Sequence, residues 1–506
     1  MNLTEWFFRI FLGLFFLFSP IVFLSAQSGK KINVLNANDF TYNRAQGDIR
    51  KLIGDVRLEH DGTYMNCDSA YMYQGNNEVE AFGNIYIKQG DTLHLYGDYL
   101  HYSGNTKFAK LRENVRLINK ETKLKTDILD YDLLLDQGFY YELGEIQTGD
   151  NFLSSINGVY YSRDEIFHYQ DSVIVINPDY RIYSDTMQYN TITEVTKFFG
   201  PTEIISDSNY IYCENGWYDT KKDVSRFSIN AVFKTNNELI MGDSLYYDRK
   251  KGIGEAYGNV IIKDSTQNIL LKGQTGYFHE KTDESMLTGD AVFIQVIEEG
   301  DSLFMHADTL RSSVDSLGIN KIINAYYGVR IFQIDLQGIC DSLSYSFADS
   351  VIRLYQSPLL WVEGKQLSAE YMELHTKNKK PHRLDLSGSA FIITQEDSLK
   401  YNQIKGKNMS AYFKDEMLHK IMVFGNGQAI YYIKDEDDGG TMGVNKSESS
   451  FITLYLKDKE IDKIILINQI DAVLNPEGET APDELKLEGF VWKEYLRPKR
   501  MEDIFK

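Results

Sequence analysis

Apolar and polar side chains alternate in short stretches along most of the chain. Ile85 and Ile87 flank Tyr86, and Val56 and Leu58 form the same pair one repeat earlier. A spacing of two places both apolar side chains on one face of a β-strand, whereas a helix would separate them. The pattern therefore predicts strands over most of the chain.

These strand segments belong to a long internal repeat. The period is about 30 residues, and about 13 units lie between about residues 50 and 430. The first apolar position of each unit is Val56, Ile85, Val115, Ile146, Val173, Thr202, Ala231, Val260, Ala291, Val329, Leu360, Ala390 or Gly427. A repeat of this length predicts one continuous stack in which each unit packs against its neighbours.

Each unit predicts two strands separated by turn residues. The first strand follows a Gly-Asn or Gly-Asp pair, as at Gly83–Asn84, and we expect a turn there because both residue types accept positive φ or form local turns. The second strand opens with an acid, as at Asp98, and places Leu100 and Tyr102 on one face. This alternation predicts an all-β fold, but not how many strands of a unit enter each sheet.

The two ends of the chain differ from the repeats. Residues 1–26 contain an apolar run that ends before Ala26, which predicts a secretory signal peptide cleaved after Ala26. An uncleaved membrane anchor is the alternative. Residues 27–433 form the repeat body, and residues 434–506 predict an acidic loop, two closing strands and a C-terminal cap.

Composition narrows the possible partners. The chain has 506 residues and a net charge of −20, so a nucleic acid is an improbable partner. A hydrophobic content of 43% with only eight prolines favours a large core built from strands. Cys67, Cys213 and Cys340 are too few for a disulfide framework. We expect them to be small residues tolerated at repeat turns, with a disulfide as the alternative.

The chain lacks the usual sequence motifs of catalysis. It has no phosphate-binding glycine loop, no Gly-x-Ser-x-Gly, no His-Glu-x-x-His and no Cys-x-x-Cys. A carboxylate pair for glycoside hydrolysis could form across stacked turns, but turn chemistry explains the regular acids better. We therefore expect neither an enzyme nor a cofactor or metal site.

The candidate functional surface is the inward, apolar face of the repeats. The inward position shrinks to Thr202, Ala231 and Ala291 in later units, which predicts more room inside them. The candidate groove residues are Val56, Leu58, Ile85, Ile87, Leu100, Tyr102, Val115, Leu117, Val173, Val175, Ile204, Phe233, Val260, Ile262, Phe293, Ile331 and Ile392.

The repeated Gly-Asn-Val-x-Ile and Asp-x-Leu-x-Tyr segments, over about residues 45 to 435, resemble the OstA-like family. This family includes LptA and the N-terminal domain of LptD. The resemblance implies an elongated, twisted open β-jellyroll whose two antiparallel sheets face each other in a V. It also implies a periplasmic component of lipopolysaccharide transport to the outer membrane. Such a protein shields acyl chains in its groove and joins other jellyroll proteins by pairing of edge strands.

Two other functions fit the repeat. A surface adhesin or structural β-repeat protein would have a closed, dry core and would be exported beyond the outer membrane. A β-helix enzyme acting on polysaccharide would have three strands per turn and a surface cluster of acids.

Overall fold

The computed structural model describes residues 30–43, 49–236, 238–265, 268–298, 301–378, 380–434, 440–476, 478–481 and 484–506. The predicted signal peptide and most of the predicted acidic loop, residues 435–439, lie outside this part of the chain. The described residues form 33 β-strands and two short 3₁₀ helices, so the predicted all-β fold is confirmed. No helix in the described ranges is long and apolar enough to cross a membrane.

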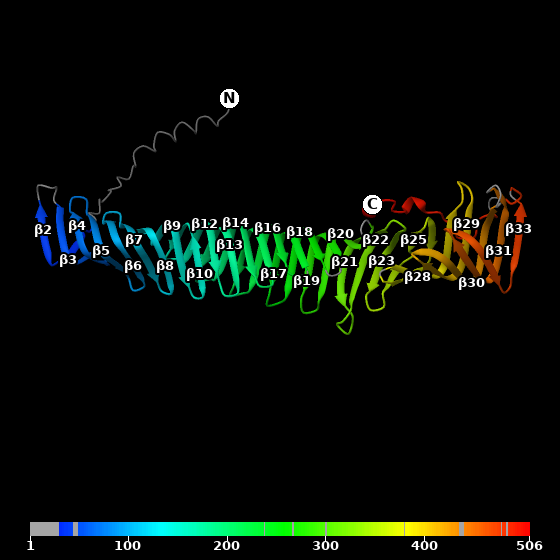
Figure 1. The fold of residues 1–506 in the computed structure, drawn as a ribbon, viewed down its shortest axis with the longest axis horizontal. Coiled ribbons are helices and arrows are strands. Elements are labelled where there is room, and N and C mark those ends of the chain that lie inside the picture. The colour runs from blue at the N-terminus through cyan, green and yellow to red at the C-terminus, as the bar shows by residue number, and fades with distance from the viewer. Residues whose placement is uncertain are drawn as a thin grey trace, which may run out of the picture. The chain divides into compact units, whose positions relative to one another are not determined.

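The chain divides into two compact units, and the first comprises Met1–Gly149 and Asn157–Arg163. Its consecutive strands pair antiparallel from β3 to β9, β11 pairs with β9, and the short β1 and β2 both pair with β3 (Figure 1). The strands are β1 (Asn33–Asn36), β2 (Asp39–Asn43), β3 (Ile49–His60), β4 (Thr63–Tyr73), β5 (Glu78–Gln89), β6 (Leu93–Ser103), β7 (Phe108–Asn119), β8 (Thr122–Asp132), β9 (Gln137–Thr148) and β11 (Asn157–Tyr161).

The second unit comprises Asp150–Ile156 and Asp164–Lys506. Its strands are β10 (Asn151–Ser155), β12 (Ile166–Ile176), β13 (Tyr180–Asn190), β14 (Val195–Ser206), β15 (Tyr210–Asp219), β16 (Val224–Lys234), β17 (Glu238–Asp248), β18 (Ile253–Asp264), β19 (Ile269–His279), β20 (Glu284–Glu298), β21 (Asp301–Val314), β22 (Lys321–Phe332), β23 (Leu336–Ser346), β24 (Val351–Tyr355), β25 (Leu359–Val362), β26 (Lys365–Ser368), β27 (Tyr371–Lys377), β28 (Lys380–Gln395), β29 (Tyr401–Lys414), β30 (Met417–Lys434), β31 (Thr441–Lys457), β32 (Glu460–Ile467) and β33 (Asp471–Pro476). The 3₁₀ helices η2 (Glu494–Leu496) and η3 (Met501–Phe505) follow.

Pairing in the second unit is also antiparallel. Strands β12 to β23 pair in chain order, and β23 then pairs with both β24 and β25. Beyond them, β28 pairs with β26, β27 and β29, while β31 pairs with β30, β32 and β33. The sequence repeat therefore forms a regular antiparallel ladder of strands.

The Gly-Asn pair of the repeat lies inside a strand, so the prediction of a turn before that strand is wrong. Gly83 and Asn84 have φ values of 74° and 46°, and the register between β5 and β6 shifts between Phe82 and Ile85. This is a β-bulge, which bends a strand without ending it. Ala81 and Ile85, on either side of the bulge, are both buried.

The acid of each repeat also lies inside a strand, so the prediction that it opens the second strand is wrong. Asn84 Nδ2 donates a 2.8 Å hydrogen bond to Asp68 on β4, and Asn114 Nδ2 donates one of 2.6 Å to Asp98 on β6. The same contact recurs, at 3.1 Å, between Asn259 and Asp243. Asparagine in the bulge and an acid on the preceding strand therefore fix the bend together.

Both halves of a bent strand bury the same face. In β5, Val79 and Ala81 before the bulge and Ile85 and Ile87 after it are all buried. The two halves thus form two walls around one apolar interior, and each long strand contributes to both walls. The sequence did not predict how many strands of a repeat enter each sheet, and the structure shows that each long strand enters both.

Candidate functional site

The interior of the first unit is a packed core. Its candidate groove residues, Val56, Leu58, Ile85, Ile87, Leu100, Tyr102, Val115 and Leu117, are all at most 1% exposed. Buried tyrosines fill the remaining width. Tyr140 lies against Gly144 and Gly158, where a Cβ at Gly158 would lie 2.2 Å from the Tyr140 hydroxyl. Only glycine leaves space for that ring.

Side-chain contacts join the free ends of the two walls in this unit. The Nδ1 of His60 lies 2.7 Å from the Tyr102 hydroxyl, and Asn119 Nδ2 donates a 2.7 Å hydrogen bond to the Tyr160 hydroxyl. The Asp61 carboxylate pairs with Lys107, whose hydrogen bond is the main reason that the Asp61 pKa is lowered to about 2. These contacts close the interior of the first unit where the free ends of its two walls meet.

The interior of the second unit is more open across β14 to β19. An apolar row runs across these strands, because each residue is the register partner of the next. The row consists of Ile204, Ile211, Phe233, Ile240, Ile262 and Leu271, and all six are half-buried. We call this part of the interior the trough. Its half-buried apolar wall distinguishes it from the packed core of the first unit.

Small residues also occur on the opposite wall of the trough. Gly216, Ala256 and Gly276 occupy one inward row there, together with the larger Phe227 and Leu245. In the first unit the corresponding row has Ala70 and Ala81 on β4 and β5 and then Leu100, Leu111, Leu129 and Tyr140. Glycine and alanine in the trough leave space locally that leucine would fill.

The trough continues into an apolar pocket beside β20 to β28. Its water-accessible volume is about 70 Å³. The lining residues are Phe293, Gln295, Leu303, Met305, Ile323, Ile331, Gln333, Leu336, Leu343, Tyr345, Ile352, Leu354, Leu360, Leu374, Thr376 and Pro381. The pocket thus has an apolar lining with few polar groups, which suits an apolar ligand.

The structure separates the candidate residues of the second unit into three groups. Ile204, Phe233 and Ile262 lie in the trough, and Phe293 and Ile331 line the pocket. The others, Val173, Val175, Val260 and Ile392, are buried. Sequence reasoning missed Ile211, Ile240 and Leu271, because it took the second strand of each repeat to begin at its acid and these residues precede that position. Their signal is a second apolar position seven to nine residues after the first.

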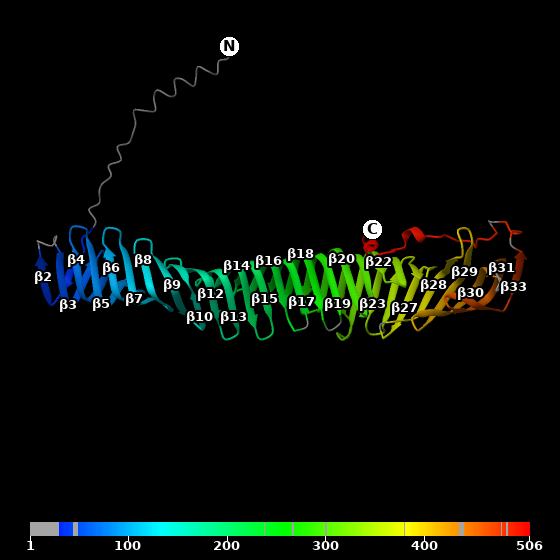
Figure 2. The same ribbon diagram turned by 45° about the horizontal axis from the view of Figure 1, so that its top comes forward.

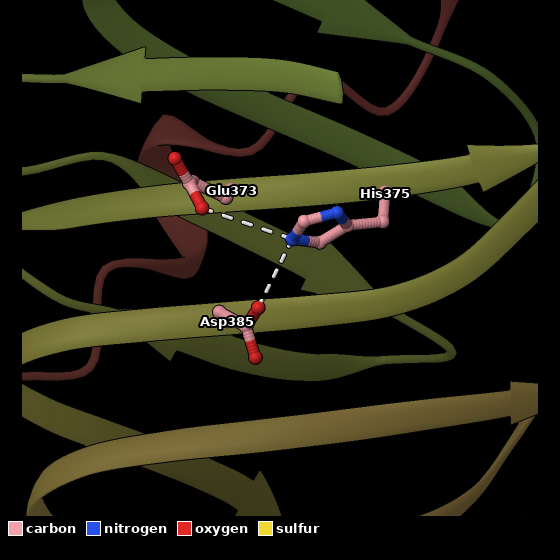
Figure 3. Close-up of side chains that lie close together, drawn as sticks. All are labelled: Glu373, His375 and Asp385. Atoms are coloured by element: carbon pink, nitrogen blue, oxygen red, sulfur yellow. Dashed lines mark hydrogen bonds and ion pairs between the residues drawn. The ribbon is translucent and has the colours of Figure 1, made fainter. Parts of the chain in front are cut away.

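One cluster outside the trough has metal-ligating side chains. Figure 3 shows His375 between Glu373 and Asp385, with His375 Nε2 lying 3.7 Å from a Glu373 oxygen and 3.0 Å from Asp385 Oδ2. Arg383 Nε lies 2.9 Å from the same Asp385 oxygen, and its Nη2 lies 3.0 Å from His375 Nε2. Arg353 pairs with Glu373 at 3.4 Å.

These arginines decide how we interpret the cluster. A divalent cation between Glu373, His375 and Asp385 would lie beside two guanidinium charges, and its histidine ligand atom already faces Arg383. Coulomb repulsion between cations at such distances opposes binding. We therefore interpret the cluster as an ion-pair network that stabilises the outer face of β27 and β28.

The cysteines are buried and free, at equivalent places in three repeats. Cys67, Cys213 and Cys340 pair in register with Val56, Thr202 and Val329, the residues that follow the bulges. Burial raises the pKa of each thiol to about 12. A protonated, buried thiol behaves as a small apolar residue, as we predicted. The predicted location at repeat turns is wrong, because the three cysteines lie inside β4, β15 and β23.

Comparisons with known proteins give a family match and similarity to solved structures, among them LptH. Residues 29–185, less than half of the chain, match the family model described as OstA-like protein. The chain is similar to LptH, described as the LptA homologous periplasmic component of the conserved lipopolysaccharide transport device from Pseudomonas aeruginosa. That similarity has 15% identity and a TM-score of 0.21, and covers 23% of this chain and 81% of LptH.

A comparison with curated proteins found no match. The family match nevertheless falls on the repeats whose Gly-Asn bulges and acids carried the resemblance. Residues 29–185 are therefore an OstA-like region, and the resemblance seen in the sequence is confirmed for that part of the chain.

Proposed function

We propose that the second unit binds the acyl chains of a lipid, lipopolysaccharide being the first candidate, and that the protein is a passive periplasmic carrier in its transport to the outer membrane. The half-buried apolar row of the trough carries this proposal. The OstA-like region supports lipopolysaccharide as the lipid. No catalytic step is part of the proposed function.

Physical chemistry favours an acyl chain in this trough. Ile240 and Ile262 face a wall that contains Ala256 and Gly276, so a chain lying between the walls would touch apolar atoms on both sides. Burying an acyl chain releases about 0.8 kcal/mol per CH₂. A few buried methylenes are therefore enough to offset the ordering of the chain. The polar part of the lipid would remain at the open side.

Edge strands are the proposed contacts with other jellyroll proteins. In the first unit, β2 pairs with β3 and carries the exposed Phe40 and Tyr42. In the second unit, β33 pairs with β31 and carries the exposed Val473 and Leu474. Edge strands with exposed apolar side chains are suited to pairing with a strand of another protein.

Photo-crosslinking tests the lipid part of the proposal. A photoreactive amino acid at Ile240 or Phe233 should form an adduct with lipopolysaccharide in cells, whereas the same group at Lys263, on the outer face of β18, should not. Ile87 in the packed core of the first unit is a second negative position. Adducts from Lys263 alone would contradict the proposal.

The packed core of the first unit favours a second candidate, a structural β-repeat protein at the cell surface. Such a protein needs a dry interior, and that of the first unit meets this requirement. The two candidates differ in location and ligand. Recovery of the protein at the cell surface, without lipid adducts at Ile240, would support the structural role.

A further inference from the structure

The last 22 residues of the second unit run back across the outside of its strands. After β33, residues 485–506 pass over the outer faces of β29, β26 and β23 toward β21 and β22 (Figures 1 and 2). We call residues 485–506 the strap. Leu487 joins a buried cluster with Phe391 and Ile393, and the rings of Phe490 and Trp492 pack against Tyr401.

Glutamines on the outer face hold the strap by its main chain. Gln403 Nε2 donates to the Leu485 carbonyl, and its Oε1 accepts from the Leu487 N–H, both at 2.8 Å. Gln366 makes the equivalent pair of hydrogen bonds, to the Val491 carbonyl at 2.8 Å and from the Lys493 N–H at 2.7 Å. Both glutamines are at most 2% exposed, so these hydrogen bonds satisfy polar groups that are shielded from water.

Beyond Gln366 the strap is held by a side chain of its own. Arg497 Nε donates a 2.8 Å hydrogen bond to Gln337 Oε1 on β23. The strap then ends in η3, where Ile504 is fully buried and the Phe505 ring lies 5.2 Å from His306. The strap has six basic and four acidic side chains, in a protein of net charge −20. Its charge therefore complements the body that it crosses.

The strands under the strap also form a wall of the apolar pocket. Gln337 follows Leu336, and Trp361 follows Leu360; both leucines line the pocket. Neighbouring residues of a strand point to opposite faces. Gln337, Trp361 and Gln366 are register partners across β23, β25 and β26, and Trp361 is fully buried. One face of this wall therefore carries the strap, and the other meets the pocket.

We propose that the strap braces this wall from outside, so that seating of the strap and occupancy of the pocket are coupled. The proposal rests on the proposed lipid-binding function and adds its regulation. Strand β25 has only four residues, and its neighbour β26 also has four, so the ladder alone holds this part of the wall weakly. Release of the strap would uncover Trp361 and loosen the packing of Leu360 against a bound chain.

Coupling of this kind acts in both directions. If a seated strap increases affinity for a ligand in the pocket, the ligand must stabilise the seated strap by the same factor. The outer groove under the strap is then a control site. An extended peptide of another protein that displaced the strap would promote release of the ligand from the pocket.

The first experiment measures the bracing without a ligand. Arg497→Ala removes the strap contact with Gln337, whereas Lys499→Ala removes an equal charge whose ion pair, with Glu494, lies within the strap. We expect faster hydrogen exchange of the β25 amides in Arg497→Ala and unchanged exchange in Lys499→Ala. Equal exchange in both full-length variants would overturn the bracing.

The second experiment measures the coupling with cis-parinaric acid, a fluorescent fatty acid. We expect the wild-type protein and Lys499→Ala to bind it alike, Arg497→Ala to bind it at least roughly five-fold more weakly, and bound probe to slow proteolysis of the strap. Equal affinities in the two variants would overturn the coupling. Failure of the wild-type protein to bind the probe would count against the proposed function itself, and the exchange experiment would still decide the bracing.

Discussion

Asn84 in the bulge of β5 donates a 2.8 Å hydrogen bond to Asp68 on β4, directly beside Gly83. A Cβ at Gly83 would lie 2.4 Å from an Asp68 oxygen, and Gly83 also has a φ of 74°. The bend therefore depends on glycine for two reasons, backbone conformation and space. Since equivalent bulges recur along the chain, this contact is a repeated element of the architecture.

Replacing Gly83 with alanine should destabilise the first unit by roughly 2–4 kcal/mol, the sum of left-handed strain and displacement of Asp68. Gly62→Ala is the matched control, because Gly62 has a φ of 81° and a Cβ added there would have no neighbouring atom within 4 Å. We expect it to cost only about 1 kcal/mol. Denaturant unfolding followed by hydrogen exchange of β5 measures the loss of stability in both variants. Equal losses of stability in the two variants would show that Asp68 moves aside freely.

Stability of the first unit should fall at acid pH through Asp61. Hydrogen bonds with Lys107 and Lys30 lower the Asp61 pKa from 3.8 in the unfolded chain to about 2. The stabilisation is therefore complete above about pH 4 and is lost as the pH falls toward 2, where the folded carboxylate takes up its proton. Thermal melts between pH 5 and pH 2 should show a steeper loss for the wild-type protein than for Asp61→Asn. Parallel curves of melting temperature against pH for the two proteins would contradict this role of Asp61.

Filling the trough should block lipid binding and leave the fold intact. Gly254 faces the interior on β18, and the nearest atoms to an added Cβ lie 3.7 Å away. Gly254→Leu should therefore fit locally but occupy space needed by a ligand. Lys263→Leu adds the same side chain to the outer face of β18 and is the control. Lipid crosslinking from Ile240 should be lost only in Gly254→Leu, while both variants keep the wild-type melting temperature within a few degrees. Unchanged crosslinking would place the ligand elsewhere.

Zinc should not stabilise the protein through the cluster at His375. Arg353 and Arg383 already pair with Glu373 and Asp385, so a cation would have to displace guanidinium groups. We expect the melting temperature to be the same with Zn²⁺ and with a chelator. A saturable rise with Zn²⁺ that His375→Ala abolishes would instead establish a metal site.

The alternation in the sequence by itself determined the strand content and the inward face of the repeats. Ile85 and Ile87 lie two residues apart, and a strand places such residues on one side whatever surrounds it. The same reasoning misplaced Gly83 and Asn84 in a turn, because positive φ suits a turn and a bulge equally well. Only the pairing of β5 with β6 shows that the strand continues through them.

Tertiary structure alone decided where the interior is closed and where it is open. Ile87 and Ile262 follow the same local pattern, yet Ile87 is fully buried and Ile262 is half-buried. In the first unit, contacts between wall ends that are distant in sequence, such as His60 with Tyr102, close the interior that contains Ile87. The strap is a further case, since Gln403 and Leu485 are 82 residues apart. Periodicity describes one strand at a time, whereas packing depends on which strands meet.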